Sequence, residues 1–128
     1  MSFLIDTHAF LWYIQASERL SQKAEDILED HNQSLYFSIA SLWEIAIKMG
    51  VGKLKIDNSF HELESLLSSL SIEILPITFA DTETYLSLPI HHRDPLDRIL
   101  IAQVMNRSLS MITADSAFNA YAIETVWL

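Results

Sequence analysis

The sequence predicts an α/β fold in which a mostly parallel central sheet of four or five short strands is flanked by helices. Short apolar runs typical of buried strands alternate with longer stretches in which apolar residues recur at helical spacing. Apolar residues make up 50% of the 128 positions, which is enough to build a real core and excludes a disordered chain. No linker, repeat or low-complexity segment interrupts this pattern, so residues 1–128 are expected to form a single domain.

The first half of the chain predicts two strands and three helices. The first strand is a wholly apolar run that ends at Asp6. The second helix has Ala24 and Leu28 on its inner side and acidic residues on its outer side. Gly50 ends the third helix. The elements expected here are, in order, a strand at 3–5, helices at 7–15 and 21–31, a strand at 35–38 and a helix at 41–49.

The second half continues the alternation after a loop at 51–58. Leu63, Leu66, Leu67 and Leu70 recur at helical spacing, and Pro76 closes the strand that follows them. The elements expected here are a helix from residue 59, a strand at 72–75, a helix at 78–86, a helix that opens at Asp94–Pro95 and lasts to about residue 106, a strand at 110–113, a short helix after Asp115 and a strand at 123–127.

Composition limits the classes of function. The chain has no cysteine, which excludes disulfides and thiolate metal sites and is compatible with a reducing cytoplasm, the location we expect. We expect no signal peptide and no membrane span, because no basic leader or apolar stretch of about 20 residues occurs. The net charge of −9 gives no general attraction to nucleic acid and favours a basic protein partner. The two glycines, Gly50 and Gly52, cannot form a phosphate-binding loop of the glycine-rich type.

Five acidic residues lie where a strand has just ended or a helix has just begun: Asp6, Glu44, Asp94, Asp97 and Asp115. In open parallel sheets, ligands bind beyond the carboxyl ends of the strands, so Asp6, Glu44 and Asp115 are expected to share one rim. The sequence leaves open how Asp94 and Asp97 lie relative to that rim. Gathered carboxylates repel one another unless a cation lies among them, and Mg²⁺ or Mn²⁺ acting on a phosphodiester is the simplest solution.

Each acid also has a structural alternative as a helix cap. Asp6 and Asp115 can cap the helices that follow them. Ser41 with Glu44, and Asp94 with Asp97, have the spacing of capping boxes. Capping accepts serine, threonine or asparagine as readily as aspartate, yet a carboxylate occurs each time, and this favours a joint site.

Four segments together resemble the PIN domain, and more narrowly the VapC-type toxins of bacterial toxin–antitoxin pairs. They cover almost the whole chain, in the expected order. The segments are LIDTH at 4–8, SIASLWEI at 38–45, HRDPLDR at 92–98 and ITAD at 112–115. The resemblance implies a three-layer PIN-like fold.

By this resemblance, Asp6, Glu44, Asp97 and Asp115 match the family's acidic quartet and are expected to be the catalytic and metal-binding residues. Asp94 is an additional candidate ligand, or only a cap. Thr113 matches a small hydroxyl residue that accompanies the last acid, and Arg98 is expected to support the site.

The resemblance implies an endoribonuclease that uses Mg²⁺ or Mn²⁺ to activate water and cleave RNA phosphodiesters. It also implies a homodimer and a small VapB-like antitoxin partner. Two other functions stay open: a catalytically silent PIN scaffold, and a receiver-like signalling domain that binds Mg²⁺ through aspartates. The RNA target, the number of metal ions and the physiological metal are not predicted.

Basic residues beside the acidic motifs are candidates for RNA phosphate contacts. They are Lys48, Lys53, Lys55, Arg93 and Arg98. Their alternative is a solvated surface, and Lys48 has the spacing to pair with Glu44 along a helix. His91–His92 lacks a third metal ligand in sequence, and His8 is expected only to support Asp6.

Aromatic side chains are expected in the core or at an interface. They are Phe10, Trp12, Tyr13, Phe37 and Trp43. Trp12 and Tyr13 are candidates for a dimer or partner groove.

Overall fold

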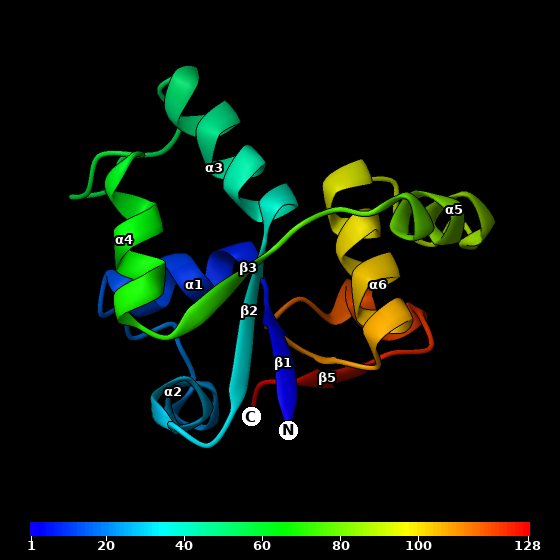
Figure 1. Ribbon diagram of the computed structural model, residues 1–128, viewed down its shortest axis with the longest axis horizontal. Helices are drawn as coiled ribbons and strands as arrows, with labels where there is room; N and C mark the ends of the chain where they lie inside the picture. The colour runs from blue at the N-terminus through cyan, green and yellow to red at the C-terminus, as the bar shows by residue number, and fades with distance from the viewer.

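Five short strands form one all-parallel sheet in the computed structural model, which describes residues 1–128 (Figure 1). The predicted α/β class with its parallel sheet is confirmed. The strand order is β3-β2-β1-β4-β5, which excludes the receiver-like alternative because receivers have the order 2-1-3-4-5. The strands are β1 (Ser2–Ile5), β2 (Ser34–Ser38), β3 (Ile72–Leu75), β4 (Ser110–Ile112) and β5 (Glu124–Val126).

Six α-helices and one 3₁₀ helix connect the strands. Helices α1, α2 and α4 lie on one side of the sheet, and α5 and α6 on the other, so the sheet is the middle of three layers (Figure 1). None of these helices has the length and apolar character needed to cross a membrane. The helices are α1 (Thr7–Ile14), α2 (Gln22–Glu29), α3 (Ile39–Gly50), α4 (Glu62–Ser69), α5 (Phe79–Ser87), α6 (Pro95–Arg107) and η1 (Ser116–Ala120).

The alternation of side chains along β1 divides the core into two halves. Phe3 and Ile5 pack with α1, α2 and α4, whereas Leu4 packs with α6 and η1. Both halves contain fully buried apolar side chains, and each of these contributes about 1.5–3 kcal/mol to the stability of the fold. The sheet is therefore held rigidly on both faces, which fixes the positions of the residues at its edge.

Two helices begin two or more residues away from the predicted position. Helix α3 begins at Ile39 rather than at residue 41, because the Ser38 hydroxyl accepts a hydrogen bond from the Ala40 N–H at 3.0 Å and caps the helix there. Helix α4 begins at Glu62 rather than at residue 59, after a turn that starts at Ser59. The short helix after Asp115 is a 3₁₀ helix.

The strand order reverses at the central strand, and we call the region beyond the carboxyl ends of β1 and β4 the crevice, after the general feature of open parallel sheets. The chain leaves β1 toward β2 and β3, then crosses to form β4 on the other side of β1. At such a reversal the two connections diverge and leave a space at the carboxyl ends of the adjacent strands. Asp6 follows β1 directly, and Thr113 to Asp115 follow β4, so both segments lie at this crevice.

A buried ion pair joins α5 to the far end of α6. Asp81 is fully buried, and its two oxygens accept hydrogen bonds from Arg107 at 2.7 and 3.0 Å. Asn106 donates to the same carboxylate at 2.9 Å, and the Thr78 N–H donates at 2.9 Å. Burial alone would raise the pKa of Asp81, but these donors and the Arg107 charge hold it well below its usual range.

Candidate functional site

Asp6 lies at the centre of the crevice, directly after β1. It is 4% exposed, and its N–H donates to the Ile112 carbonyl of β4 at 3.0 Å. Its carboxylate accepts a hydrogen bond from the Thr113 hydroxyl at 2.9 Å. Asp6 occupies the N-cap position of α1, but its side chain makes no capping hydrogen bond, so the cap alternative is wrong for this residue.

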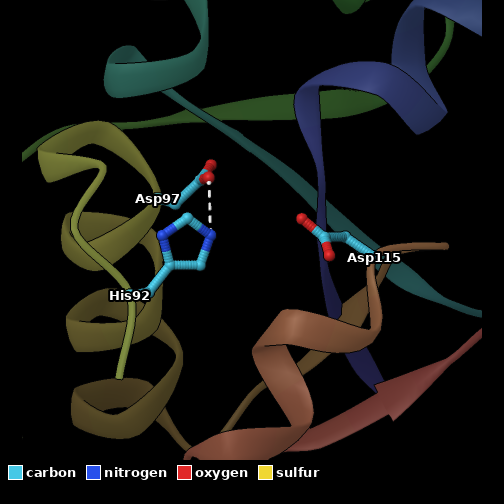
Figure 2. A group of neighbouring side chains, drawn as sticks. All are labelled: His92, Asp97 and Asp115. Carbon is cyan, nitrogen blue, oxygen red and sulfur yellow. Dashed lines mark ion pairs between the residues drawn. The ribbon is translucent and has the colours of Figure 1, made fainter. Parts of the chain in front are cut away.

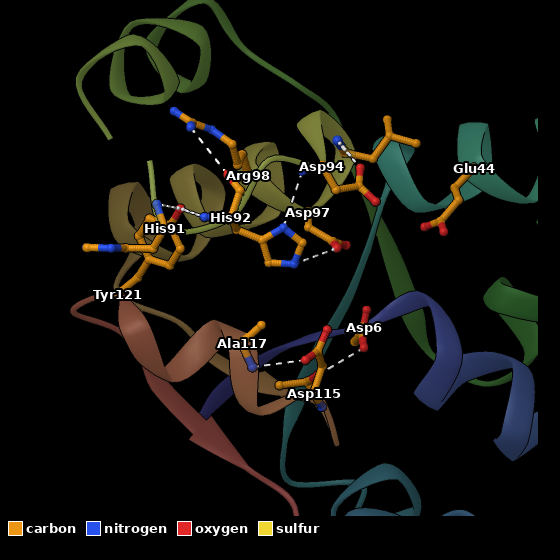
Figure 3. Close-up of polar contacts among 12 residues, drawn as sticks. Asp6, Glu44, His91, His92, Asp94, Asp97, Arg98, Asp115, Ala117 and Tyr121 are labelled. Atoms are coloured by element: carbon orange, nitrogen blue, oxygen red, sulfur yellow. Dashed lines mark hydrogen bonds and ion pairs between the residues drawn. The ribbon is translucent and has the colours of Figure 1, made fainter. Parts of the chain in front are cut away.

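Thr113 links the two acids that follow β1 and β4. Its hydroxyl donates to Asp6 and accepts a hydrogen bond from the Asp115 N–H at 3.0 Å. Asp115 caps η1 with one oxygen, which accepts from the Ala117 N–H at 2.9 Å. Both roles predicted for Asp115 are therefore compatible, because its side chain caps η1 from a position facing the crevice (Figure 3).

Asp97 reaches the crevice from the first turn of α6. Its side chain is 18% exposed, and one oxygen lies 3.2 Å from Nε2 of His92. Asp94 caps α6 by accepting from the Leu96 N–H at 2.9 Å, with Pro95 in the first turn as expected. The predicted capping box does not form, because the Asp94 N–H donates to Nδ1 of His92 instead of to Asp97.

Glu44 lies beside this group on α3. Its carboxylate pairs with Lys48 at 2.8 Å along the helix, which is the structural alternative named for Lys48. The predicted capping box with Ser41 is wrong, since α3 starts at Ile39 and the Ser41 hydroxyl accepts from Thr7 at 2.8 Å. Figure 3 shows Glu44 across from Asp94 and Asp97 at the edge of the same crevice.

The other four carboxylates are close enough to Asp97 to affect its ionisation. Burial and the negative charges of these neighbours together raise the pKa of Asp97 to about 7; the neighbours are Asp94, Asp6, Glu44 and Asp115. Burial also raises the pKa of Asp6, and it outweighs the opposite effects of the Thr113 hydrogen bond and of His8. The site thus concentrates five carboxylates, and Lys48, which pairs with Glu44, is the one lysine or arginine that forms an ion pair with any of them.

These side chains fit a hard divalent cation. Asp97 and Asp115 each offer a carboxylate oxygen, and these two atoms and a ring nitrogen of His92 lie within 4.8 Å of one another (Figure 2). Carboxylate oxygens dominate the set, which is the donor chemistry that Mg²⁺ and Mn²⁺ prefer. A bound cation would also favour the ionised form of Asp97, which the neighbouring carboxylates disfavour.

Arg98 does not face the carboxylates, contrary to its expected role beside them. It is 7% exposed, and its guanidinium donates to the carbonyls of Tyr85 at 3.1 Å and Leu88 at 3.3 Å. The guanidinium also stacks 4.6 Å from the Tyr85 ring centre. Figure 3 shows it directed away from the acids, so the predicted RNA phosphate contact is wrong for Arg98. The other predicted basic residues, Lys53, Lys55 and Arg93, are exposed.

His92 lies in the site although the sequence analysis set the His91–His92 pair aside for lack of a third metal ligand. Its position two residues before the Asp94 cap was the available signal, but nothing local indicated that the preceding loop folds back over Asp97. Tyr121 holds that loop from the far side, because its hydroxyl accepts from the N–H groups of His91 at 3.2 Å and His92 at 2.9 Å and donates to the Pro89 carbonyl at 3.0 Å.

The aromatic residues divide between core and surface. Phe10 and Phe37 pack in the core with ring centres 4.3 Å apart, as expected. Trp12 is partly buried against Trp127. Trp43 is 59% exposed, so of the two positions predicted for it, the core and an interface, only the interface is left; its neighbour one turn along α3, Ile47, is 46% exposed.

Comparisons with known proteins agree with this architecture. The PIN domain family model matches residues 3–124. No curated protein sequence was found to match the chain. Solved structures with the same fold include VapBC2 from Rickettsia felis bound to a promoter DNA fragment, with a TM-score of 0.75, 18% identity and full coverage of both chains.

Two structures from Mycobacterium tuberculosis share the fold as well. VapC20, described as a toxin that cleaves the sarcin–ricin loop, has a TM-score of 0.69 and 12% identity, with 98% of this chain and 99% of that chain covered. VapBC-5, a toxin–antitoxin system of the VapBC family, has a TM-score of 0.63 and 20% identity, with 99% and 98% covered. At these identities the likeness establishes the fold alone.

Proposed function

Because the chain belongs to the PIN domain family, we propose that it is an endoribonuclease that requires Mg²⁺ or Mn²⁺ and acts as the toxin of a VapBC-type toxin–antitoxin pair. One observation carries the proposal. Burial and the charges of four neighbouring carboxylates raise the pKa of Asp97, and no lysine or arginine forms an ion pair with Asp6, Asp94, Asp97 or Asp115. Such a site is built to receive a cation from outside the chain.

In this proposal the ion is held by Asp6, Glu44, Asp97 and Asp115, with Asp94 as a further ligand or only the cap of α6. The bound ion supplies two effects, a lower pKa for a coordinated water and neutralisation of charge on the phosphodiester. The Thr113 hydroxyl fixes the rotamer of Asp6 and ties Asp115 to it through the backbone. The close packing of β1 against β4 then keeps these ligands in place without the ion.

RNA needs positive contacts beyond the site, because the protein as a whole repels it. Arg93 is exposed one residue before Asp94, and Lys53 and Lys55 are exposed in the segment after α3. We assign phosphate contacts to these three residues. Lys48 is engaged with Glu44, so its role is to balance that carboxylate.

Cleavage of labelled RNA tests the function directly. The wild-type protein should cleave members of an RNA panel with Mg²⁺ or Mn²⁺ and lose this activity with EDTA. Asp6→Asn removes one ligand charge while preserving shape, and should lower the cleavage rate at least about 100-fold. Asp26→Asn is the matched control, since Asp26 is exposed on α2 and far from the crevice in sequence and fold. Normal Mg²⁺-dependent cleavage by Asp6→Asn would overturn the assignment.

The partners of this proposal are a small VapB-like antitoxin and a second copy of the chain. The charge of −9 suits a basic antitoxin segment, and the solved structures with the same fold include a VapBC2 structure and a member of the VapBC family of toxin–antitoxin systems. Exposed Trp43 and Ile47 offer an apolar surface on α3 for a homodimer. Co-expression with the neighbouring reading frame and sedimentation of the purified chain test the two partners separately. We place this single-domain protein in the cytoplasm.

A further inference from the structure

Hydrogen bonds of its backbone and contacts of its ring hold His92 in one orientation. Its N–H donates to the Tyr121 hydroxyl at 2.9 Å, and its carbonyl accepts from Arg98 at 3.5 Å. Its ring lies 5.9 Å from that of Phe118, and the side chain is 17% exposed. A histidine so constrained presents fixed atoms to the crevice.

The two ring nitrogens of His92 have different partners. The Asp94 N–H donates to Nδ1 at 3.3 Å, which requires a lone pair on Nδ1. In the neutral ring the proton then lies on Nε2, and Nε2 is 3.2 Å from Asp97 Oδ2. Nε2 is therefore a donor to the carboxylate, and its lone pair is not available to a metal ion.

We infer that His92 is a positioning residue, which holds Asp97 in place for the metal by donating from Nε2, and is not itself a metal ligand. This inference rests on the proposed metal-dependent function. The donated hydrogen bond fixes one oxygen of Asp97 and leaves the other directed to the crevice. The Asp94 N–H sets the tautomer of His92. The imidazole ring of His92 therefore couples the cap residue of α6 to the orientation of Asp97.

The same arrangement explains why Arg98 is buried although it follows Asp97. Its guanidinium holds the carbonyls of Leu88 and His92, at the two ends of the segment that folds over Asp97. Tyr121 holds the middle of that segment at Pro89 and His91. Arg98 and Tyr121 thus hold the backbone on which the His92 ring is mounted, without contacting the proposed metal ligands.

Nitrogen NMR of protein labelled with ¹⁵N-histidine tests the tautomer without any cleavage assay. We expect His92 to carry its proton on Nε2 in the metal-free protein and to keep it when Mg²⁺ is added. A proton on Nδ1 in the metal-free protein, or loss of the Nε2 proton with Mg²⁺, would overturn the inference. The metal-free spectrum shows which nitrogen carries the proton even if Mg²⁺ does not bind. The inference about His92 can therefore fail while the proposed function holds, and the reverse.

Mn²⁺ affinity, measured by electron paramagnetic resonance, tests the positioning role. His92→Ala should weaken Mn²⁺ binding about tenfold, the lower limit typical of residues that orient a ligand. His92→Gln keeps an N–H donor near the position of Nε2 and should bind Mn²⁺ within about threefold of wild type. His91→Ala is the control, because His91 is exposed and its side chain faces Tyr121.

Two outcomes would contradict the positioning role. Wild-type affinity in His92→Ala would show that Asp97 needs no support, and equal weakening in His92→Gln and His92→Ala would show that donation is not what His92 supplies. If His92→Ala does not fold, as judged by circular dichroism, His92→Gln and the NMR spectrum still decide.

Discussion

Helix α6 has a carboxylate near each end, one fully buried and one partly buried, and their surroundings shift their pKa values in opposite directions. At its C-terminal end, Asp81 of α5 is surrounded by Arg107, Asn106 and the Thr78 N–H, and its pKa lies well below the usual range. At its N-terminal end, Asp97 has four other carboxylates as neighbours, and burial raises its pKa to about 7.

The difference shows how a structural carboxylate can be told from a functional one. Burying a charge is costly, so a carboxylate that serves the fold comes with its own cation and hydrogen bonds. A carboxylate that is buried among like charges makes the fold less stable until a ligand arrives. The comparison therefore predicts opposite effects of substitution at the two ends of α6.

The largest effect is expected at the structural end. Asp81→Ala leaves Arg107 without its partner, and breaking a buried pair in this way costs about 3–5 kcal/mol in the free energy of unfolding. Urea denaturation measures the loss. Glu83→Ala on the exposed side of α5 is the matched control and should change stability by no more than about 0.5 kcal/mol. A loss of stability for Asp81→Ala as small as that of the control would contradict the structural role assigned to Asp81.

Metal binding should stabilise the functional end by a somewhat smaller amount. At a free Mn²⁺ concentration of about 100 times the dissociation constant, wild type should gain about 2.7 kcal/mol. Asp97→Asn removes a ligand and should gain little at the same concentration, whereas Asp81→Asn should keep the gain even though it is less stable. Thermal unfolding with and without Mn²⁺ measures both. Equal stabilisation of wild type and Asp97→Asn would place the ion elsewhere.

The smallest effect is a dependence of the free energy of unfolding on pH. It has opposite signs for Asp97 and Asp81, at the two ends of α6. Because the folded-state pKa of Asp97 is raised, the unfolded chain loses its proton first, and stability falls as pH rises from about 4 to 7. Because the pKa of Asp81 is lowered, its contribution is present above about pH 4 and is lost as pH falls.

Between pH 4 and 7, the free energy of unfolding of metal-free Asp97→Asn should therefore fall by about 1 kcal/mol less than that of wild type. The difference is small because solvent screens much of the interaction at a partly exposed group. Urea denaturation at several pH values measures the difference. A pH profile in Asp97→Asn identical to that of wild type would show that the neighbouring carboxylates do not destabilise the metal-free fold.

The parts of the site that follow strands were predictable, and the parts that depend on tertiary contacts were not. Asp6 and Asp115 were expected together because parallel strands end at the same edge of the sheet, and β1 and β4 are paired. Asp97 came only from the family resemblance, since the sequence does not say on which side α6 starts. The burial of Arg98 depends on a carbonyl of α5 and on the loop before α6, which no local pattern encodes.

Helix α3 shows a second limit of local patterns. Ser38 and Ser41 are both good cap residues, and only the end of β2 decides between them. The choice of Ser38 moves Glu44 from the first turn into the second, where it pairs with Lys48. The exposure of Trp43 could not be predicted either, because an apolar helix face has the same sequence pattern whether it packs against the core or against a partner protein.

The central claim is that acids distant in the chain converge to hold one kind of cation, and a crystal soaked in MnCl₂ tests it most directly. The account predicts an anomalous manganese peak bounded by the carboxylates of Asp6, Asp97 and Asp115, with His92 outside the coordination sphere. The absence of a manganese peak at these carboxylates, or a peak with His92 in the coordination sphere, would contradict it.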